Sequence, residues 1–180
     1  GIMSCGVIPS VLEIMDRPTI TAINQNTDLG LPEVDAMLLV ETDGYTGEET
    51  TYQLEKILAV LKANNPLEVT QAKTKEEAAL LWKARKTAYA VLARIQTHFA
   101  LEDVTVPMGK VTDLLRGIGE IAKRHNLQIA TFGHAGDGNL HPQILFDGYD
   151  PEQVKHMEQA VAELFQLSVD LSGTLTGEHG

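Results

Sequence analysis

The feature that most constrains the fold is a glycine-rich polar motif between two apolar runs. The motif covers residues 132–142 (FGHAGDGNLHP), and the apolar runs are 128–132 and 140–147. Two such runs separated by a short loop that contains glycine predict two antiparallel strands joined as a hairpin. A hairpin at this place disfavours a doubly wound nucleotide-binding sheet, whose neighbouring strands are parallel.

The rest of the chain alternates between strand-like and helix-like patterns. Capping boxes at Thr46 and Thr74 predict the starts of two helices, the second running to about residue 99. Before residue 36, the apolar segment after Pro9 is helix-like, and residues 19–32 have the composition of a linker. The remaining elements are strands at 36–42, 67–72 and 101–106 and helices at 111–125 and 151–171. This order predicts an α+β, ferredoxin-like fold, in which helices pack on one face of an antiparallel sheet.

Composition limits the classes of partner. The 180 residues suit one domain, and the net charge of −11 argues against nucleic acid and anionic membrane surfaces as general partners. The apolar runs are too short to span a bilayer, and the single Cys5 fits a reducing, cytoplasmic location. The chain starts at Gly1 and stops inside a polar, glycine-rich motif, so we expect residues 1–180 to be one domain of a longer protein.

The polar motif carries candidate metal ligands. His134 and His141 lie at the two ends of the predicted hairpin loop, where their side chains could approach each other. Two histidines and one carboxylate are a common ligand set for zinc or another divalent transition ion. Glu178, in the second polar cluster at 176–180, or Asp137 could supply the carboxylate. The alternative is a polar hairpin turn with surface histidines, and the spacing does not separate the two readings.

Two further residues stand out from their surroundings. Arg85 falls within the apolar stripe of the longest predicted helix, where a guanidinium needs an anion. That anion is either a protein carboxylate or an acidic substrate. His179, next to Glu178, is a candidate general base because imidazole titrates near neutral pH.

Four segments carry a resemblance to a known family. Residues 82–85 (WKAR), 102–107 (EDVTVP), 133–142 and 172–180 (SGTLTGEHG) resemble signatures of the C-terminal domain of FAD-linked oxidases. Within that family the likeness is to the glycolate oxidase subunit GlcD and D-lactate dehydrogenase branch. It extends over most of the chain.

The resemblance implies a cap domain over FAD that is held mainly by an N-terminal flavin domain absent from residues 1–180. It implies oxidation of a small 2-hydroxy acid, glycolate or D-lactate, to the 2-oxo acid with hydride transfer to the flavin. Partner oxidase subunits, and membrane association through them, are compatible with it. The residue roles that it implies are a divalent metal on His134, His141 and Glu178, proton removal by His179, substrate contacts from Arg85 and Gln143, and a cofactor contact from Asn139.

Two departures and two alternatives remain. Some relatives carry Asn in place of Gln143 and Lys in place of Glu102, which leaves room for a different hydroxy acid. A stand-alone metal-binding or regulatory module of ferredoxin-like shape would use the same histidines. So would a metallohydrolase built on His134, His141 and Asp137.

Overall fold

The computed structural model describes residues 1–175; residues 176–180 lie outside the described part. Single-turn helices at Ile2–Ser4 and Met108–Lys110 accompany the main elements. These are β1 (Val11–Asp16), α1 (Arg17–Asn26), β2 (Ala36–Glu41), α2 (Gly47–Ala63), α3 (Lys75–Ile95), β3 (His98–Leu101), β4 (Val104–Thr105), α4 (Val111–His125), β5 (Gln128–His134), β6 (Asn139–Phe146) and α5 (Pro151–Asp170).

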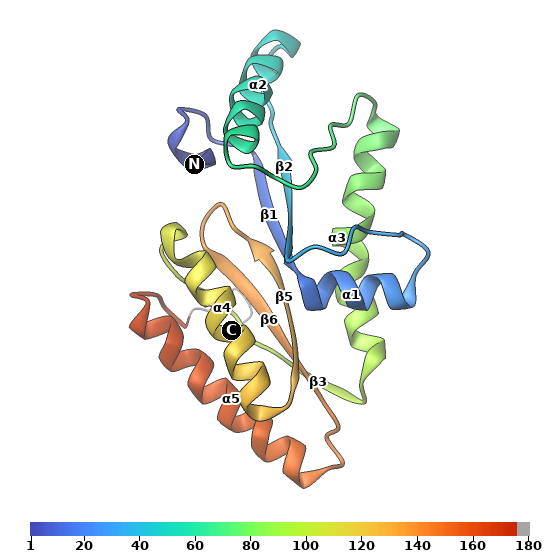
Figure 1. Ribbon diagram of the computed structural model, residues 1–180, viewed down its shortest axis with the longest axis vertical. Helices are drawn as coiled ribbons and strands as arrows, with labels where there is room; N and C mark the ends of the chain where they lie inside the picture. Colours follow the sequence, from blue (N-terminus) through green and yellow to red (C-terminus); the bar gives the residue numbers. More distant parts are fainter. Residues whose placement is uncertain (176–180) are drawn as a thin grey trace.

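The strands form one sheet in the order β2-β1-β5-β6-β3, and β4 pairs with β6 beyond the end of β3. Every pairing between these strands is antiparallel. The predicted hairpin is present as β5 and β6, which lie at the centre of the sheet (Figure 1). The expected α+β class with an antiparallel sheet is confirmed.

The helices cover both faces of the sheet, whereas we expected them on one. In Figure 1, α4 and α5 lie on one side of β5 and β6, and α1 and α3 lie on the other. Neighbouring residues of β1 show the reason, because Ile14 packs with the α4–α5 side and Met15 with the α1–α3 side. Successive strand residues point to opposite faces of the sheet. A central strand with apolar side chains on both faces therefore needs helices on both sides of the sheet.

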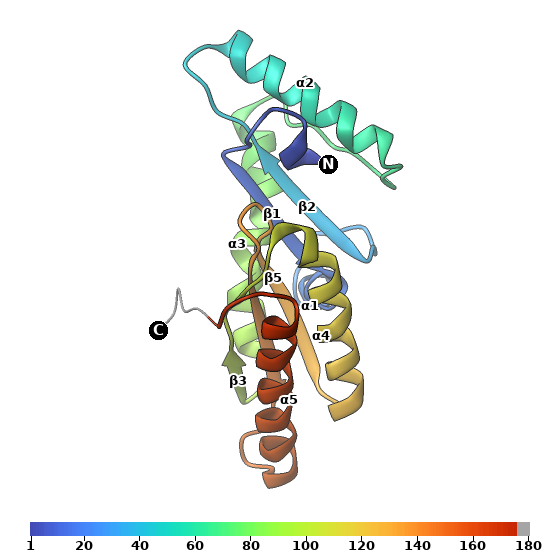
Figure 2. The same ribbon diagram turned by 90° about the vertical axis from the view of Figure 1, so that its left-hand side faces the viewer.

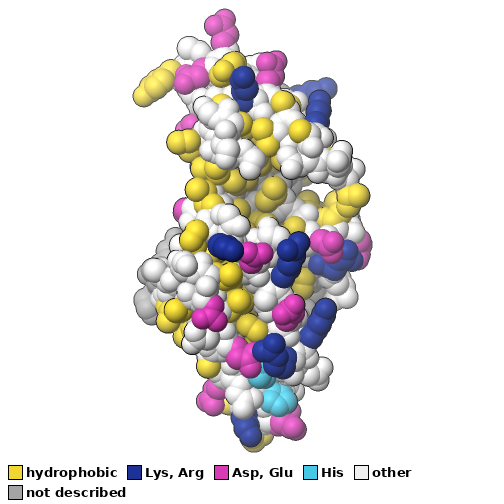
Figure 3. Space-filling model, turned by 60° about the vertical axis from the view of Figure 1, so that its left-hand side comes forward, with side chains coloured by type: hydrophobic (Ala, Val, Ile, Leu, Met, Phe, Trp, Pro, Cys, Tyr) yellow, Lys and Arg dark blue, Asp and Glu magenta, His cyan; other side chains and the backbone are white. Residues whose placement is uncertain are grey.

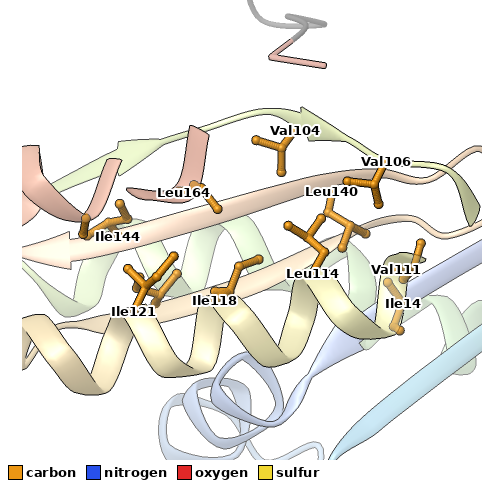
Figure 4. Close-up of a cluster of buried hydrophobic side chains, with 12 residues drawn as sticks. Ile14, Val104, Val106, Val111, Leu114, Ile118, Ile121, Leu140, Ile144 and Leu164 are labelled. Atoms are coloured by element: carbon orange, nitrogen blue, oxygen red, sulfur yellow. The ribbon is translucent and has the colours of Figure 1, made fainter. Parts of the chain in front are cut away.

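The core under α4 and α5 follows from the periodicity of α4. Figure 4 shows Leu114, Ile118 and Ile121 of α4 directed at Leu140 and Ile144 of β6. The expected C-terminal end of this helix is also confirmed, because Asn126 takes the left-handed conformation with φ 52°.

Several of the expected elements are wrong. Val11–Asp16 is a strand rather than a helix-like segment, and α1 occupies part of the expected linker. Residues 67–72 do not form a strand, and Leu67 is 88% exposed. By contrast, Thr46 and Thr74 cap α2 and α3 as expected, each accepting a hydrogen bond from the amide of the third residue after it.

Asp16 joins β1, α1 and β5. Its Oδ1 accepts hydrogen bonds from the Thr19 amide (2.9 Å) and hydroxyl (2.7 Å), and its Oδ2 accepts one from the Thr131 amide (2.9 Å). Burial raises the pKa of the Asp16 carboxyl, while the hydrogen bonds from Thr19 and Thr131 act in the opposite direction. The carboxyl group therefore caps α1 and ties it to the sheet.

We expect Asp16→Ala to lower the free energy of unfolding by about 2–3 kcal/mol, because a helix cap is lost and two buried amides lose their acceptor. Urea denaturation measures this change. Asp35→Ala is the matched control, since Asp35 pairs with Arg17 at the surface and its side chain is 95% exposed; it should change stability by less than about 0.5 kcal/mol. Equal effects of the two substitutions would contradict the role of Asp16.

Part of the sheet remains uncovered. Figure 2 shows α2 at the opposite end of the molecule from α5, and within residues 1–175 only Ile57 of α2 is buried. Figure 3 shows apolar side chains gathered across the middle of one face. Ile8 and Leu38 are among the exposed apolar residues, at 78% and 47%. Among residues 1–175, no helix is long and apolar enough to cross a membrane.

Candidate functional site

The hairpin places the polar motif in two rows on the α3 face of the sheet. Directly opposite residues of antiparallel strands share a face. Glu13 of β1 is opposite His134 of β5, which is opposite Asn139 of β6. In the next row, Phe132 is opposite His141. Phe132 also packs in the α1–α3 core, so both rows face α3.

The loop between β5 and β6 requires glycine at residue 138. Gly138 has φ +83°, and its carbonyl accepts a hydrogen bond of 3.1 Å from the Val106 amide. A Cβ atom at residue 138 would lie 1.9 Å from the Val106 carbonyl oxygen. Asp137 turns its Oδ1 to the Asn139 amide at 3.0 Å, so this carboxylate stabilises the loop itself. That contact favours a structural role for Asp137 over a ligand role.

Gly138→Ala should lower the free energy of unfolding by about 3 kcal/mol, since it adds a backbone clash to a left-handed conformation. Thermal unfolding monitored by circular dichroism measures the loss. Gly119→Ala is the control, because residue 119 lies inside α4 and an added Cβ there has no neighbour within 4 Å; it should stabilise by about 0.5–1 kcal/mol. A neutral Gly138→Ala variant would show that the loop can rearrange.

The two histidines meet across the hairpin, as the sequence analysis expected. Their ring centroids are 5.2 Å apart, and the ring planes are nearly perpendicular at 86°. The Nδ1 atom of His134 contacts Glu13 Oε1, and the Nδ1 atom of His141 lies 3.5 Å from Asp103 Oδ1. The His134–Glu13 contact is a hydrogen bond, whereas the His141–Asp103 contact is an ion-pair distance without one. Metal-binding histidines commonly donate the N–H of one ring nitrogen to a carboxylate in the way that His134 contacts Glu13.

Arg85 reaches from α3 into the same cluster. Its Nε donates to Glu13 Oε2 at 2.6 Å, and its guanidinium lies over the Phe132 ring at 4.4 Å from the centroid. The protein carboxylate that we considered for Arg85 is therefore Glu13. Only the Nε edge has an acceptor among residues 1–175, so the terminal nitrogens are the ones suited to an external anion.

Gln143 lies deeper on the same face. It is opposite Ala130 and Leu101, and its side chain is fully buried. Neither its amide oxygen nor its amide nitrogen has a hydrogen-bond partner in the described residues. Buried amides are almost always hydrogen-bonded, so this position is suited to a polar ligand or water.

The chain returns to the hairpin after α5. Thr174 forms a two-way backbone bridge with Thr105, at 2.8 and 3.1 Å, and Thr105 is paired with Asn139. Glu178 and His179, two of our expected site residues, lie outside the described residues. Within residues 1–175 no group of three or more His, Cys, Asp and Glu side chains could hold a metal ion. The structure thus brings the two histidines together, while the metal-ligand roles of His134, His141 and Glu178 all stay predictions.

Two acidic residues at the β3–β4 junction border the site. The Glu102 amide donates to the Pro142 carbonyl at 3.0 Å, and burial raises the pKa of the Glu102 carboxyl. Asp103 is only 8% exposed and faces His141. Asp103 lies within residues 102–107, one of the four segments that carry the family resemblance, but neither the sequence pattern nor the resemblance assigns it a role.

Glu13 was missed altogether. A carboxylate inside the apolar segment 11–15 was the available signal, because a charged residue in a buried strand needs a partner. The assignment of that segment to a helix hid the signal. Correctly paired, Glu13 lies directly across from His134.

The sequence matches one known protein family over its whole length. Residues 1–180 match the model of the FAD linked oxidases, C-terminal domain. The chain belongs to this family. The resemblance stated from the four segments is thereby confirmed.

Several curated proteins of this family are similar over nearly the whole chain. The glycolate oxidase subunit GlcD of Bacillus subtilis is 41% identical over 180 residues, which cover 99% of this chain and 38% of that protein. The subunit from Escherichia coli K12 is 32% identical over 99% of the chain and 36% of its own length. The mitochondrial D-lactate dehydrogenase [cytochrome] of Arabidopsis thaliana is 30% identical, with 31% of its length covered. The chain therefore spans about a third of the length of these relatives.

A solved structure of alkyldihydroxyacetonephosphate synthase shares the fold. It superposes with a TM-score of 0.57 at 12% identity, covering 97% of this chain and 36% of that protein. At this identity the likeness bears on architecture alone.

Proposed function

We propose that this domain forms the substrate side of the active site in an FAD-dependent 2-hydroxy-acid oxidoreductase. The observation that carries the proposal is Arg85, which Glu13 and Phe132 hold beside the histidine pair. A cation in a partly buried, oriented setting matches the carboxylate of a small hydroxy acid. Family membership and the GlcD and D-lactate dehydrogenase relatives support the same reaction class.

Each residue of the cluster has a role in this proposal. Arg85 binds the substrate carboxylate through its terminal nitrogens, and Gln143 offers a buried amide to the substrate. His134 and His141, with Glu178, would hold a divalent metal such as zinc, which when bound lowers the pKa of the substrate hydroxyl. His179 takes the hydroxyl proton.

The cofactor and the partner domain complete the proposal. FAD, bound mainly by a separate flavin domain of the same protein, accepts the hydride. Asn139, the first residue of β6 after the hairpin loop, contacts the FAD. The apolar side chains gathered on the face in Figure 3 are suited to contacts with that domain or another oxidase subunit, and so are the exposed Ile8 and Leu38. A cytoplasmic location, which the single Cys5 supports, remains part of the proposal.

Spectroscopy of the full-length protein tests the function. The purified protein should be yellow, and anaerobic addition of D-lactate or glycolate should bleach its flavin absorbance. A colourless protein, or a flavin that neither acid reduces, would contradict the proposal. Metal bound by a colourless protein would favour the stand-alone metal-binding module instead.

A further inference from the structure

Glu13 is shared between the two parts of the proposed site. Its Oε2 accepts from Arg85 Nε at 2.6 Å, while its Oε1 contacts His134 Nδ1. The residue is 7% exposed and lies on β1, between β2 and β5 in the sheet. One carboxylate thus fixes both the anion-binding residue and one of the histidines.

The chemistry of the two contacts defines what Glu13 does. Arg85 Nε always carries a proton, so Oε2 must act as an acceptor. Oε1 is also an acceptor, so it favours the imidazole tautomer with the proton on Nδ1 of His134. In that tautomer Nε2 carries a lone pair, which is the form that can coordinate a metal.

We propose that Glu13 is a positioning residue that holds Arg85 for the substrate carboxylate and sets His134 in the metal-binding tautomer. This inference rests on the proposed function for its substrate half, whereas its tautomer half concerns residues 13 and 134 alone. Glu13 touches neither substrate nor cofactor in this scheme. It acts through its two neighbours.

The substitution Glu13→Gln separates this role from simple filling of space. Glutamine has nearly the same shape, but it offers one acceptor oxygen and one donor NH₂ group. If the oxygen stays on Arg85, the NH₂ group donates to His134 Nδ1 and moves the imidazole proton to Nε2. If the amide is flipped, its NH₂ group faces Arg85 Nε–H, and two donors cannot form a hydrogen bond. Glutamine therefore cannot satisfy both neighbours and keep the metal-binding tautomer.

The experiment uses the full-length protein and three readouts, which are bound metal after incubation with Zn²⁺, KM for D-lactate or glycolate, and flavin content. Glu13→Gln should weaken Zn²⁺ binding by about 10- to 100-fold, raise KM and leave flavin content unchanged. In an Arg85→Ala background, Glu13→Gln should still weaken Zn²⁺ binding but should no longer change KM. Glu13→Asp keeps two acceptor oxygens and should retain more Zn²⁺ than Glu13→Gln.

Glu41→Gln is the matched control. Glu41 also lies on a strand and accepts a hydrogen bond from α3, through Trp82 Nε1 at 2.8 Å, but it is outside the histidine cluster. It should leave Zn²⁺ binding and KM at wild-type values.

The outcomes separate the inference from the function on which its substrate half rests. Zn²⁺ binding and KM of Glu13→Gln within twofold of wild type would overturn the inference. If Glu13→Gln fails to fold, Glu13→Asp decides, and a loss of Zn²⁺ as large as that in His134→Ala would overturn it. A flavin that no 2-hydroxy acid reduces would contradict the proposed function, while the Zn²⁺ comparison would still test the tautomer half.

Discussion

Arg85→Ala should lower kcat/KM for 2-hydroxy-acid oxidation by about 100- to 1,000-fold, while flavin content remains at the wild-type level. Removing one partner of a partly buried, charge-assisted contact costs about 2–5 kcal/mol. The expected fall equals about 2.7–4.1 kcal/mol at 1.36 kcal/mol per tenfold, which lies within that range. The Arg85 side chain is 17% exposed and is oriented by Glu13 and Phe132, so neither water nor a nearby side chain replaces it readily. Steady-state kinetics with D-lactate and with glycolate measure the effect.

Two variants make this prediction specific. Arg85→Lys keeps the charge but loses the planar set of donors, so it should recover only part of the activity. Lys86→Ala removes a neighbouring cation of α3 that lies over the Trp82 ring, 5.7 Å from its centroid, and it should leave kcat/KM unchanged. Unchanged kinetics for Arg85→Ala would refute its role as the carboxylate-binding residue.

His134→Ala should abolish both metal binding and turnover, with a fall in kcat of at least about 1,000-fold. The side chain is one half of the histidine pair, whose ring centroids lie 5.2 Å apart, and no other histidine of residues 1–175 is paired with His141 in this way. Elemental analysis of the purified protein measures bound metal, and the flavin absorbance shows whether the protein is still folded around its cofactor.

The control for this substitution is another histidine at a distance from the site. His156 of α5 has its ring centroid 6.1 Å from that of His125, on the opposite face of the sheet from α3. His156→Ala should leave metal content and kcat unchanged. Equal metal content in His134→Ala and wild type would remove His134 from the ligand set.

Elements with local signals were predictable from the sequence. The hairpin follows from two apolar runs around a glycine-containing loop, and α3 follows from its Thr74 cap and apolar stripe. The proximity of His134 and His141 follows from the hairpin alone. Arg85 was also recognisable, since a guanidinium on an apolar helix face requires an anion.

Elements that depend on distant contacts were not predictable. All of the last four residues of β1 are buried, so this strand lacks the alternation of polar and apolar residues that marks a half-exposed strand. α1 contains threonine and asparagine, which have low helix propensity, and it is stabilised by Asp16 and by burial of Ile20 and Ile23. Glu13 was missed for the same reason, because its role appears only once β1 is paired with β5.

We propose that Arg85 and the histidine pair bind a 2-hydroxy acid against the flavin. A crystal structure of the full-length protein with the bound 2-oxo acid product tests it most directly. We predict that the carboxylate of the ligand lies within hydrogen-bond distance of the Arg85 terminal nitrogens, and that its 2-oxo oxygen is directed at His134 and His141. A ligand bound elsewhere, with Arg85 engaged only by Glu13, would contradict the claim.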